Sequence, residues 1–260
     1  MNIVIITGAS SGIGREFALQ MDSHFPKIDE FWLVARNGKR LAELGRSLQH
    51  RTRIFALDIT KKSSLDTLEK AAFLHDAAVR MLINCAGYGI MGSFCEQDAD
   101  LELGMIHLNC EALTDLTHRM IPYMRWGSRI IQLASSAAFL PQPGFSVYAA
   151  TKSYVLSFSR ALGEELKNAG IYVTSVCPGP VDTPFFDIAE ATGSTLAVKK
   201  YTMVTADRVV AQALKDSYHK RPMSVCSLPI KAFHALSKAV PHSLILQATK
   251  RMKKKEKKGL

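Results

Sequence analysis

The sequence predicts an α/β protein built on a doubly wound parallel sheet of seven strands, with helices on both faces. Short runs rich in apolar and β-branched residues alternate with segments of helical periodicity from the first residue onward. These runs are continuously apolar, which is typical of parallel strands buried on both faces. A chain of 260 residues with 47% hydrophobic residues also suits one large domain with a full core.

Each predicted strand corresponds to one apolar run, and right-handed crossovers then join the strands into one sheet. The seven runs are Asn2–Ile6, Glu30–Ala35, Thr52–Leu57, Met81–Asn84, Arg129–Leu133, Tyr172–Val176 and Met223–Ser227. Helical patterns fill the gaps, for example Gly14–Met21, Lys39–Gln49, Leu101–Tyr123 and Tyr148–Asn168. We therefore expect a main domain over residues 1–228 and a C-terminal helical extension with a basic tail over residues 229–260.

Two stretches interrupt the alternation. Phe185–Thr205 follows a Pro-Gly-Pro turn after the sixth strand and has weak periodicity, so it is a candidate lid. The chain ends in an apolar segment followed by seven Lys or Arg residues and one Glu between Lys250 and Lys258, which carry most of the formal net charge of +10. We favour a packed helix with a solvated tail; the alternative is peripheral membrane contact. No aromatic residue is interleaved with these lysines, so we expect no nucleic-acid partner.

The composition argues against several other classes of protein. The five cysteines form no Cys-x-x-C pair, which disfavours a zinc finger or a redox dithiol and indicates a reducing compartment. The eight histidines are scattered without a His-x-x-x-His pair, so we expect no metal site. We recognise no signal peptide, and no apolar run reaches the roughly 18 residues of a membrane span. A cytoplasmic location is therefore expected.

A glycine-rich turn lies between the first strand and the first helix. It reads Thr7-Gly8-Ala9-Ser10-Ser11-Gly12-Ile13-Gly14 and is followed by Arg15. Such glycines let the backbone approach a pyrophosphate, toward which the helix N-terminus directs its N–H groups. Ser10 and Ser11 either cap the helix or bind phosphate oxygens. The expected cofactor contacts from this turn are Gly8, Ser10, Ser11, Gly12, Ile13, Gly14 and Arg15.

The end of the second strand predicts which dinucleotide is bound. An NAD enzyme usually has an acidic residue there for the ribose 2′-hydroxyl, whereas this chain has Ala35 followed by Arg36. A guanidinium suits a 2′-phosphate, and Arg15 is close enough in sequence to assist. We therefore favour NADP(H) over NAD(H) as the cofactor.

Two further strand ends add candidate cofactor contacts. Asp58, followed by Ile59, closes the third strand, where its carboxylate can accept from the adenine amino group, cap the next helix or do both, with Thr60 as another candidate for the cap. Asn84 closes the fourth strand and is followed by Cys85, Ala86 and Gly87. The glycine lets the backbone pass close to the adenine ribose, so we include Asn84, Ala86 and Gly87 among the cofactor contacts.

The candidate catalytic residues are Tyr148, Lys152 and Ser135. Tyr148 and Lys152 are four residues apart on a predicted helix and therefore share one face. A phenol with a pKa of about 10 is a poor acid or base, and we expect the lysine charge and an oxidised nicotinamide to lower its pKa. Ser135 follows the fifth strand, where it can hold a substrate carbonyl, with Ser136 as the competing candidate. Tyr148 and Lys152 also count as cofactor contacts.

The loop after the sixth strand completes the predicted site. It reads Pro178-Gly179-Pro180-Val181-Asp182-Thr183. Its prolines and glycine make a rigid wall, and we expect the nicotinamide to meet Pro178, Gly179, Val181 and Thr183.

In these motifs the sequence resembles the short-chain dehydrogenase/reductase family over about Met1 to Ser227. The glycine turn is similar to the family's Thr-Gly-x-x-x-Gly-x-Gly, and Tyr148 with Lys152 to its Tyr-x-x-x-Lys. Cys85 departs mildly from the family's Asn-Asn-Ala-Gly. The resemblance implies a Rossmann-type catalytic domain, a fourth catalytic residue at Asn109 that binds a water for a proton relay to Lys152, and a homodimer or homotetramer formed through Leu101–Tyr123 and Tyr148–Asn168.

The predicted function is therefore an NADP(H)-dependent oxidoreductase that interconverts a ketone or aldehyde and a secondary or primary alcohol by hydride transfer. The variable stretches near the site hold Tyr88, Phe139, Phe145, Phe185 and Phe186 and few charges. We therefore expect a small hydrophobic substrate, such as a steroid, acyl or aromatic carbonyl. The alternative is a catalytically weak NADP(H) sensor with a membrane-associating tail.

Overall fold

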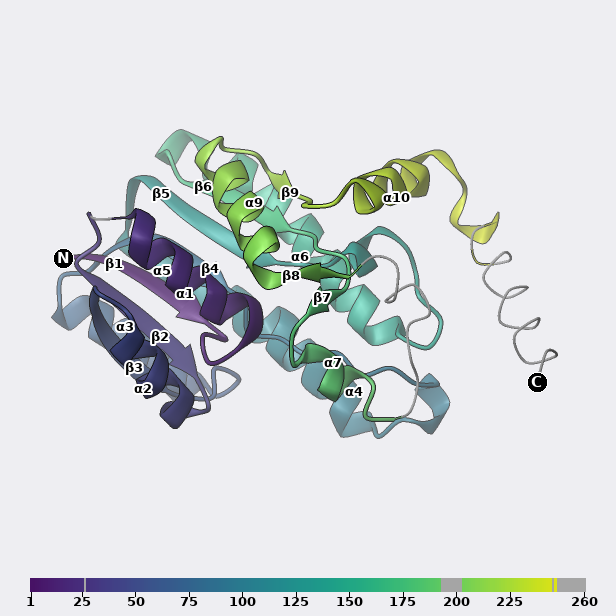
Figure 1. Cartoon of the computed structure of the whole chain (residues 1–260), viewed down its shortest axis with the longest axis horizontal. Helices are drawn as coiled ribbons and strands as arrows, with labels where there is room; N and C mark the ends of the chain where they lie inside the picture. Colours follow the sequence, from purple (N-terminus) through teal and green to yellow (C-terminus); the bar gives the residue numbers. More distant parts are fainter. Residues whose placement is uncertain (26, 193–202, 245, 247–260) are drawn as a thin grey trace.

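A seven-stranded parallel sheet in the order β3-β2-β1-β4-β5-β6-β9 forms the centre of the molecule (Figure 1). The computed structural model describes residues 1–25, 27–192, 203–244 and 246. The strands are β1 (Asn2–Thr7), β2 (Glu30–Ala35), β3 (Arg51–Ala56), β4 (Ala78–Asn84), β5 (Met124–Leu133), β6 (Tyr172–Val176) and β9 (Met223–Ser224). The predicted fold class is confirmed.

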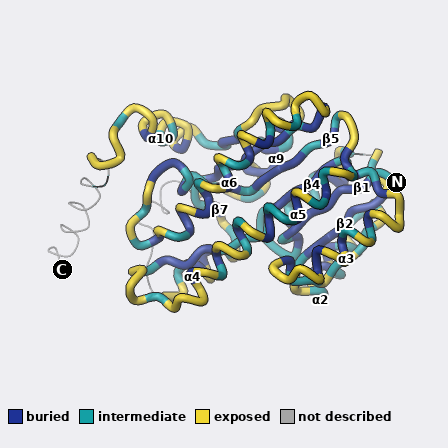
Figure 2. Tube along the Cα trace, turned by 180° about the vertical axis from the view of Figure 1, so that it is seen from behind, coloured by how far each residue is buried: buried dark blue, intermediate teal, exposed yellow. Residues whose placement is uncertain are grey.

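Helices cover both faces of the sheet, and the strands divide their side chains between them. Ile3 and Ile5 of β1 pack in one core with α3, α5 and α6, whereas Val4 and Ile6 pack in the other with α1, α2 and α9. The helices are α1 (Gly12–His24), α2 (Gly38–Ser47), α3 (Lys62–Leu74), α5 (Leu113–Met120), α6 (Ser146–Glu165) and α9 (Ala206–Tyr218). The strands are mostly buried and the helices keep exposed outer sides (Figure 2). This two-sided burial is the physical origin of the uninterrupted apolar runs.

The order of the strands reverses at β1. From β1 the chain continues to β2 and then to β3 on one side of the sheet. It then returns to form β4, which pairs with the other side of β1. Crossover segments that leave neighbouring strands in opposite directions open a crevice at the carboxyl ends of β1 and β4. The glycine-rich turn lies at this crevice.

The remaining elements lie at both edges of the sheet: those directly before β5 and β6 lie at its amino edge, and the others gather beyond its carboxyl edge. They are η1 (Phe94–Glu96), α4 (Ala99–Ile106), η2 (His107–Ala112), η3 (Ile121–Tyr123), η4 (Ser136–Phe139), η5 (Lys167–Ala169), β7 (Val181–Asp182), α7 (Phe185–Ala189), β8 (Val204–Thr205) and α10 (Leu228–Ala239). The helix predicted over Leu101–Tyr123 is present as α4, η2, α5 and η3, because η2 is a π-helical turn that interrupts the regular α-helix. Asn109 lies in this turn.

Several predicted boundaries differ from the observed ones. The fifth strand begins at Met124 instead of Arg129, with Gly127 at a φ of +84° within it. The seventh ends at Ser224 because Leu228 already begins α10, so the expected boundary at residue 228 falls in the first turn of that helix. The predicted lid Phe185–Thr205 begins as α7 and ends as β8, and residues 193–202 lie outside the described residues.

Among the described residues, no helix has both the length and the apolar character needed to cross a bilayer.

Candidate active site

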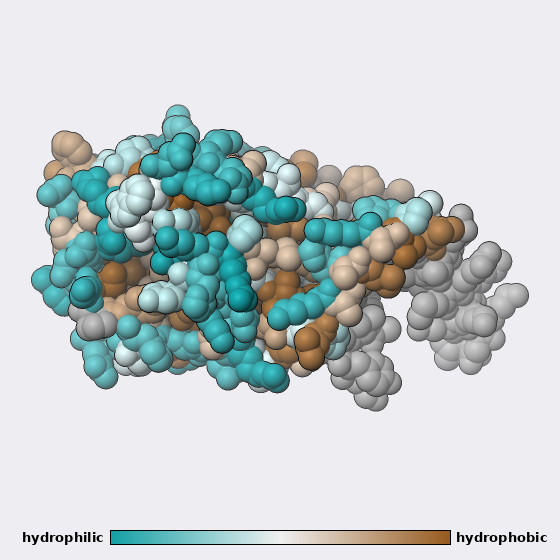
Figure 3. Space-filling view, turned by 90° about the horizontal axis from the view of Figure 1, so that it is seen from above, coloured by the Kyte–Doolittle hydropathy of each residue, from teal (hydrophilic) through white to brown (hydrophobic). Residues whose placement is uncertain are grey.

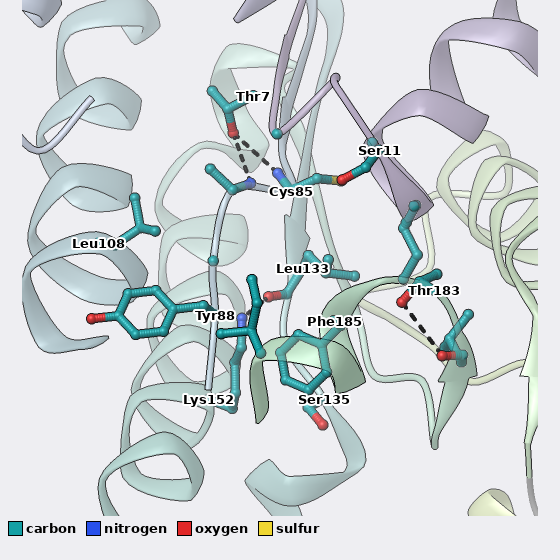
Figure 4. A pocket seen from close by; sticks show the side chains of 18 of the residues that line it. Thr7, Ser11, Cys85, Tyr88, Leu108, Leu133, Ser135, Lys152, Thr183 and Phe185 are labelled. Atoms are coloured by element: carbon teal, nitrogen blue, oxygen red, sulfur yellow. Dashed lines mark hydrogen bonds between the residues drawn. The ribbon is translucent and has the colours of Figure 1, made fainter. Parts of the chain in front are cut away.

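A cavity of about 1200 Å³ opens at the carboxyl edge of the sheet (Figure 4). It brings together residues from the first strand to α10, and most of the predicted site residues line it. These are Gly8, Ser10, Ser11, Gly12, Ile13, Gly14, Arg36, Asp58, Ile59, Ala86, Gly87, Ser135, Tyr148, Lys152, Pro178, Gly179, Val181 and Thr183. Of the predicted residues, Arg15, Asn84 and Asn109 do not line it.

The glycine-rich turn leaves no room for side chains. Gly8 and Gly12 have φ values of +68° and +51°, which favour glycine. A Cβ on Gly8 would lie 2.8 Å from the amide nitrogen of Ala86, and a Cβ on Gly14 would lie 2.4 Å from the carbonyl oxygen of Gly8. The turn therefore presents bare backbone at the N-terminus of α1, which fits the pyrophosphate of a dinucleotide. Ser11 is the N-cap residue of α1, but its side chain makes no capping hydrogen bond.

Thr7 ties the ends of β1 and β4 together. Its Oγ1 accepts hydrogen bonds from the backbone amides of Cys85 and Ala86, both at 3.1 Å (Figure 4). These bonds fix the segment Cys85–Gly87 against the glycine turn. This role of Thr7 was not predicted, although a threonine that ends a strand directly before a glycine turn is a usable signal.

The outer end of the cavity carries arginine side chains. Arg36 and Arg40 both line it and are exposed, with Asn37 between them in sequence. Arg40 was not predicted; it lies one turn into α2, whose N-cap is Asn37. Arg15 is exposed outside the cavity wall, so its predicted assistance to a phosphate has no support in the cavity lining.

Asp58 lies at the same end of the cavity. Burial raises the pKa of its carboxyl, but hydrogen bonds from Thr60 and the charges of Arg36 and Lys61 outweigh this effect and lower it. Its Oδ1 accepts from the hydroxyl of Thr60 at 2.7 Å and from the Thr60 amide at 3.1 Å. The alternative role as helix cap was wrong, because the N-cap residue of α3 is Lys61.

Asn84 lies beneath the cavity. Its side chain is 2% exposed, and its Nδ2 donates to Thr117 Oγ1 and Gln132 Oε1, both at 3.0 Å. The predicted cofactor contact of its side chain is therefore not supported. The side chain instead links β4 to α5 and β5, because the end of β4 directs it into the buried side of the sheet.

Tyr148 and Ser135 meet at the inner end of the cavity. The Tyr148 ring stacks on Phe145 with centroids 4.2 Å apart, and Phe185 lies 5.5 Å from it on a different element. Burial raises the pKa of Tyr148 to about 12, and the hydrogen bond to Ser135 opposes this rise. This effect on the phenol favours Ser135 over Ser136 as the residue that acts with Tyr148. The expected lowering of the phenol pKa is not produced by the protein's own groups, since burial outweighs them.

Lys152 lies on the same helix face as Tyr148. Its ammonium donates to the carbonyl oxygen of Leu133 at 2.8 Å and is 5.6 Å from the centre of the Tyr148 ring. Burial lowers the pKa of this amine to about 8. The cation is therefore the main form at pH 7, held next to the phenol as the i, i+4 spacing predicted.

Asn109 is fully buried behind the cavity wall. Its Nδ2 donates to the Tyr88 carbonyl at 2.9 Å and to Thr151 Oγ1 at 3.1 Å, and its Oδ1 accepts from the Tyr88 amide at 3.1 Å. The side chain thus connects the loop after β4 to helix α6. Its π-helical turn departs from i to i−4 bonding, a feature often found at functional sites.

Comparison with known proteins identifies the family. The family model for short chain dehydrogenases matches residues 2–193, which contain the glycine turn and the Ser135, Tyr148 and Lys152 cluster. The chain belongs to the short-chain dehydrogenase/reductase family. It is accordingly an oxidoreductase that acts on an alcohol or a carbonyl compound with a nicotinamide cofactor.

Three similar members of the family differ in what their names describe. Sulfoacetaldehyde reductase 2 of Chromohalobacter salexigens is 33% identical over 194 residues, which cover 71% of this chain and 74% of that protein. A short-chain dehydrogenase from Sphingobium yanoikuyae in complex with NADPH has 30% identity and a TM-score of 0.78, with 92% and 93% of the two chains covered. A bulky-bulky ketone specific alcohol dehydrogenase from Comamonas testosteroni has 25% identity and a TM-score of 0.74, with 92% of each chain covered.

Proposed function

We propose that this chain is an NADP(H)-dependent oxidoreductase that interconverts a hydrophobic ketone or aldehyde and the corresponding alcohol. One observation carries the proposal: the glycine turn, the Arg36 side chain and the pair Tyr148 and Lys152 line the same cavity. A dinucleotide spans the distance between a phosphate-binding turn and a catalytic pair in this fold. The cavity extends from the glycine turn to Tyr148 and Lys152.

The preference for NADP(H) rests on the charge at the end of β2. Arg36 and Arg40 line the cavity there, and the residues Ala35 and Asn37 are uncharged. Two guanidinium groups favour a 2′-phosphate, whereas an NAD enzyme usually has a carboxylate for the 2′-hydroxyl. The similarity to a short-chain dehydrogenase in complex with NADPH supports this choice.

The catalytic residues donate the proton, hold the carbonyl oxygen and stabilise the phenolate. The bound reduced cofactor supplies a hydride to the carbonyl carbon, and oxidation of the alcohol is the reverse. Tyr148 gives its hydroxyl proton to the carbonyl oxygen, and Ser135, which is bonded to that hydroxyl, donates to the same oxygen. The Lys152 cation stabilises the phenolate that remains. Lys152 then returns a proton, with the π-helical turn at Asn109 holding a connecting water.

The substrate end of the cavity favours an apolar molecule. Phe145, Phe185, Phe186, Ile230 and Phe233 line it. Among the described lining residues, the basic side chains other than Lys152 are Arg36 and Arg40 at the opposite end and His107, which is hydrogen-bonded to Glu111. A sulfonate such as sulfoacetaldehyde would lack a guanidinium partner here, so a bulky ketone, a steroid, an acyl chain or an aromatic carbonyl fits better.

The test is a panel of ketones and alcohols followed at the nicotinamide absorbance, with NADPH and NADH in parallel. We expect NADPH oxidation with apolar ketones, and kcat/KM that rises about fourfold for each methylene added to a straight-chain series until the cavity is filled. A preference for NADH would contradict the cofactor assignment. A preference for small anionic aldehydes would contradict the substrate assignment.

Self-association is proposed as well. Leu101, Leu103 and Ile106 of α4 and Tyr154 of α6 are exposed, by 42%, 51%, 42% and 43%. Apolar side chains gathered on neighbouring helices are typical of a contact with a second copy. Light scattering after size-exclusion chromatography should report a dimer or tetramer, and Leu103→Ser with Ile106→Ser should lower the mass. A wild-type monomer would contradict this proposal.

A further inference from the structure

Helix α10 forms the outer wall of the catalytic cavity. Pro229, Ile230 and Phe233 on its inner side line the cavity. The rings of Phe233 and His234 lie 6.2 and 4.5 Å from the ring of Phe139 in η4, the turn that follows Ser135. The helix is thus attached to the substrate end of the site and extends outward from the sheet (Figure 1).

The outer side of the same helix is also apolar. Leu228 and Leu236 are 79% and 54% exposed, and Leu244, just after the helix, is 55% exposed. Hydrophobic side chains gather along the arm that α10 forms (Figure 3). A helix with apolar side chains on both sides requires a second apolar environment besides the protein core.

Positive charge accompanies these leucines. Lys231 and Lys238 are exposed on α10, and seven Lys or Arg residues follow in the sequence between Lys250 and Lys258. An apolar helix face joined to a basic segment is complementary to an anionic lipid surface, which offers acyl chains and phosphates together. An isologous contact with a second copy would bring the same cations together, which costs energy.

We propose that α10 and the basic tail dock this protein on an anionic lipid surface, with the α10 wall of the cavity beside the lipid. Leu228, Leu236 and Leu244 enter the interface, and the cations contact the lipid headgroups. Ile230 and Phe233 then separate the catalytic cavity from the membrane by one helix. A hydrophobic carbonyl compound dissolved in the lipid reaches Tyr148 past α10, and this last step rests on the proposed function.

The test is sedimentation of the full-length protein with vesicles of phosphatidylcholine, with and without phosphatidylserine. We expect binding to the phosphatidylserine vesicles and its loss at 1 M salt.

A variant with Leu228→Ser, Leu236→Ser and Leu244→Ser should bind at least about tenfold more weakly. So should a variant in which Lys253, Lys254, Lys255, Lys257 and Lys258 become Gln. A matched control with Phe73→Ser and Leu74→Ser, equally exposed at the end of α3, should bind like the wild type.

Three outcomes would overturn the inference. The first is no sedimentation of the wild type, and the second is equal loss in the α3 control. The third is unchanged vesicle binding of the leucine variant together with a lower molecular mass in solution, which would assign the leucines to a second copy. None of the substituted leucines lines the cavity. If all variants turn over a small water-soluble ketone but vesicle binding fails, the proposed function is upheld and the docking on lipid is refuted. If turnover is absent but vesicle binding is retained, the docking is upheld and the proposed function is refuted.

Discussion

The two ends of the cavity are built in different ways. At the cofactor end, backbone groups of the β1–α1 turn and of Cys85–Gly87 form the surface, held by the Thr7 hydrogen bonds. At the substrate end, aromatic and aliphatic side chains from α6, α7 and α10 form it. Tyr148 lies between them, stacked on Phe145 and bonded to Ser135.

This difference explains which properties of the site a motif can reveal. A surface of bare backbone requires glycine at fixed positions, because a Cβ on Gly8 or Gly14 would overlap neighbouring backbone atoms. A surface of side chains accepts many apolar residues of similar volume. A recognisable pattern can therefore indicate the end that is built from backbone. The substrate choice that we propose instead depends on residues such as Phe185 and Phe233, which belong to no sequence pattern.

The largest expected effect comes from the residue between the two ends. Tyr148→Phe removes the proton donor and keeps the stacked ring, so we expect kcat for ketone reduction to fall about 10²–10⁴-fold. Tyr154→Phe, on the same helix but bonded to Thr114 outside the cavity, is the control and should keep the wild-type rate. Titration with NADPH should show that both variants still bind the cofactor, which assigns the loss to the chemical step. An undiminished rate for Tyr148→Phe would refute the mechanism.

The next effect should be confined to the cofactor end. Arg36→Gln removes a charge that faces the predicted 2′-phosphate, so the Kd for NADPH should rise about 10–100-fold while that for NADH stays the same. Lys39→Gln, a charge change on α2 outside the cavity lining, is the control. Equal weakening of both cofactors by Arg36→Gln would show that the arginine contacts a part they share.

Local patterns predicted the fold and many of the residues that line the cavity. The continuous apolar runs identified the parallel strands, since side chains on both faces of β1 are buried. The glycine turn, Ser135, Tyr148 and Lys152 could be predicted because each follows a strand end or a helical spacing. Thr7 was missed because its partners, the amides after β4, are distant in the sequence.

Properties that depend on packing between distant segments could not be predicted. The pKa of Tyr148 rises because Phe145, Phe185 and neighbouring elements bury the phenol, which helical spacing with Lys152 does not reveal. Asn84 ends a strand like a site residue, but its side chain is buried and donates to Gln132 of β5. The contribution of α10 to the cavity also required the structure, because the sequence indicated only an apolar segment that packs as a C-terminal helix.

The third effect concerns pH. Because burial lowers the pKa of Lys152 to about 8, the cation that stabilises the phenolate is lost as pH rises through that value. We expect kcat/KM for ketone reduction to fall about tenfold for each pH unit above this pKa. Lys152→Arg stays charged, so its residual activity should lack this fall. A flat wild-type profile between pH 7 and roughly 9 would contradict the assignment.

The contribution of Lys152 to stability should change in the opposite direction over the same range. The unfolded Lys152 keeps its proton up to a pKa of 10.5, whereas the folded one loses it near 8. The unfolded state therefore binds more protons between these values, and the Lys152 contribution makes the free energy of unfolding rise with pH. Cys85 and Cys177 contribute the opposite dependence, because burial raises the pKa of each thiol to about 12 whereas unfolded thiols ionise at roughly pH 8.5–9. The Lys152 contribution should therefore be measured as the difference in thermal unfolding between the wild type and Lys152→Met from pH 8 to roughly 9, since the cysteines are the same in both.

The smallest effect should be confined to the substrate end. Phe185→Ala removes the ring that lies 5.5 Å from Tyr148, so kcat/KM for a bulky apolar ketone should fall about fivefold to tenfold while the Kd for NADPH stays constant. A small ketone that does not reach α7 should be reduced at the wild-type rate. Phe94→Ala, 62% exposed and outside the cavity lining, is the matched control. If Phe185→Ala weakens NADPH binding as strongly as ketone turnover, the division of the cavity into a backbone-built cofactor end and a side-chain-built substrate end is wrong, because α7 would then contribute to both.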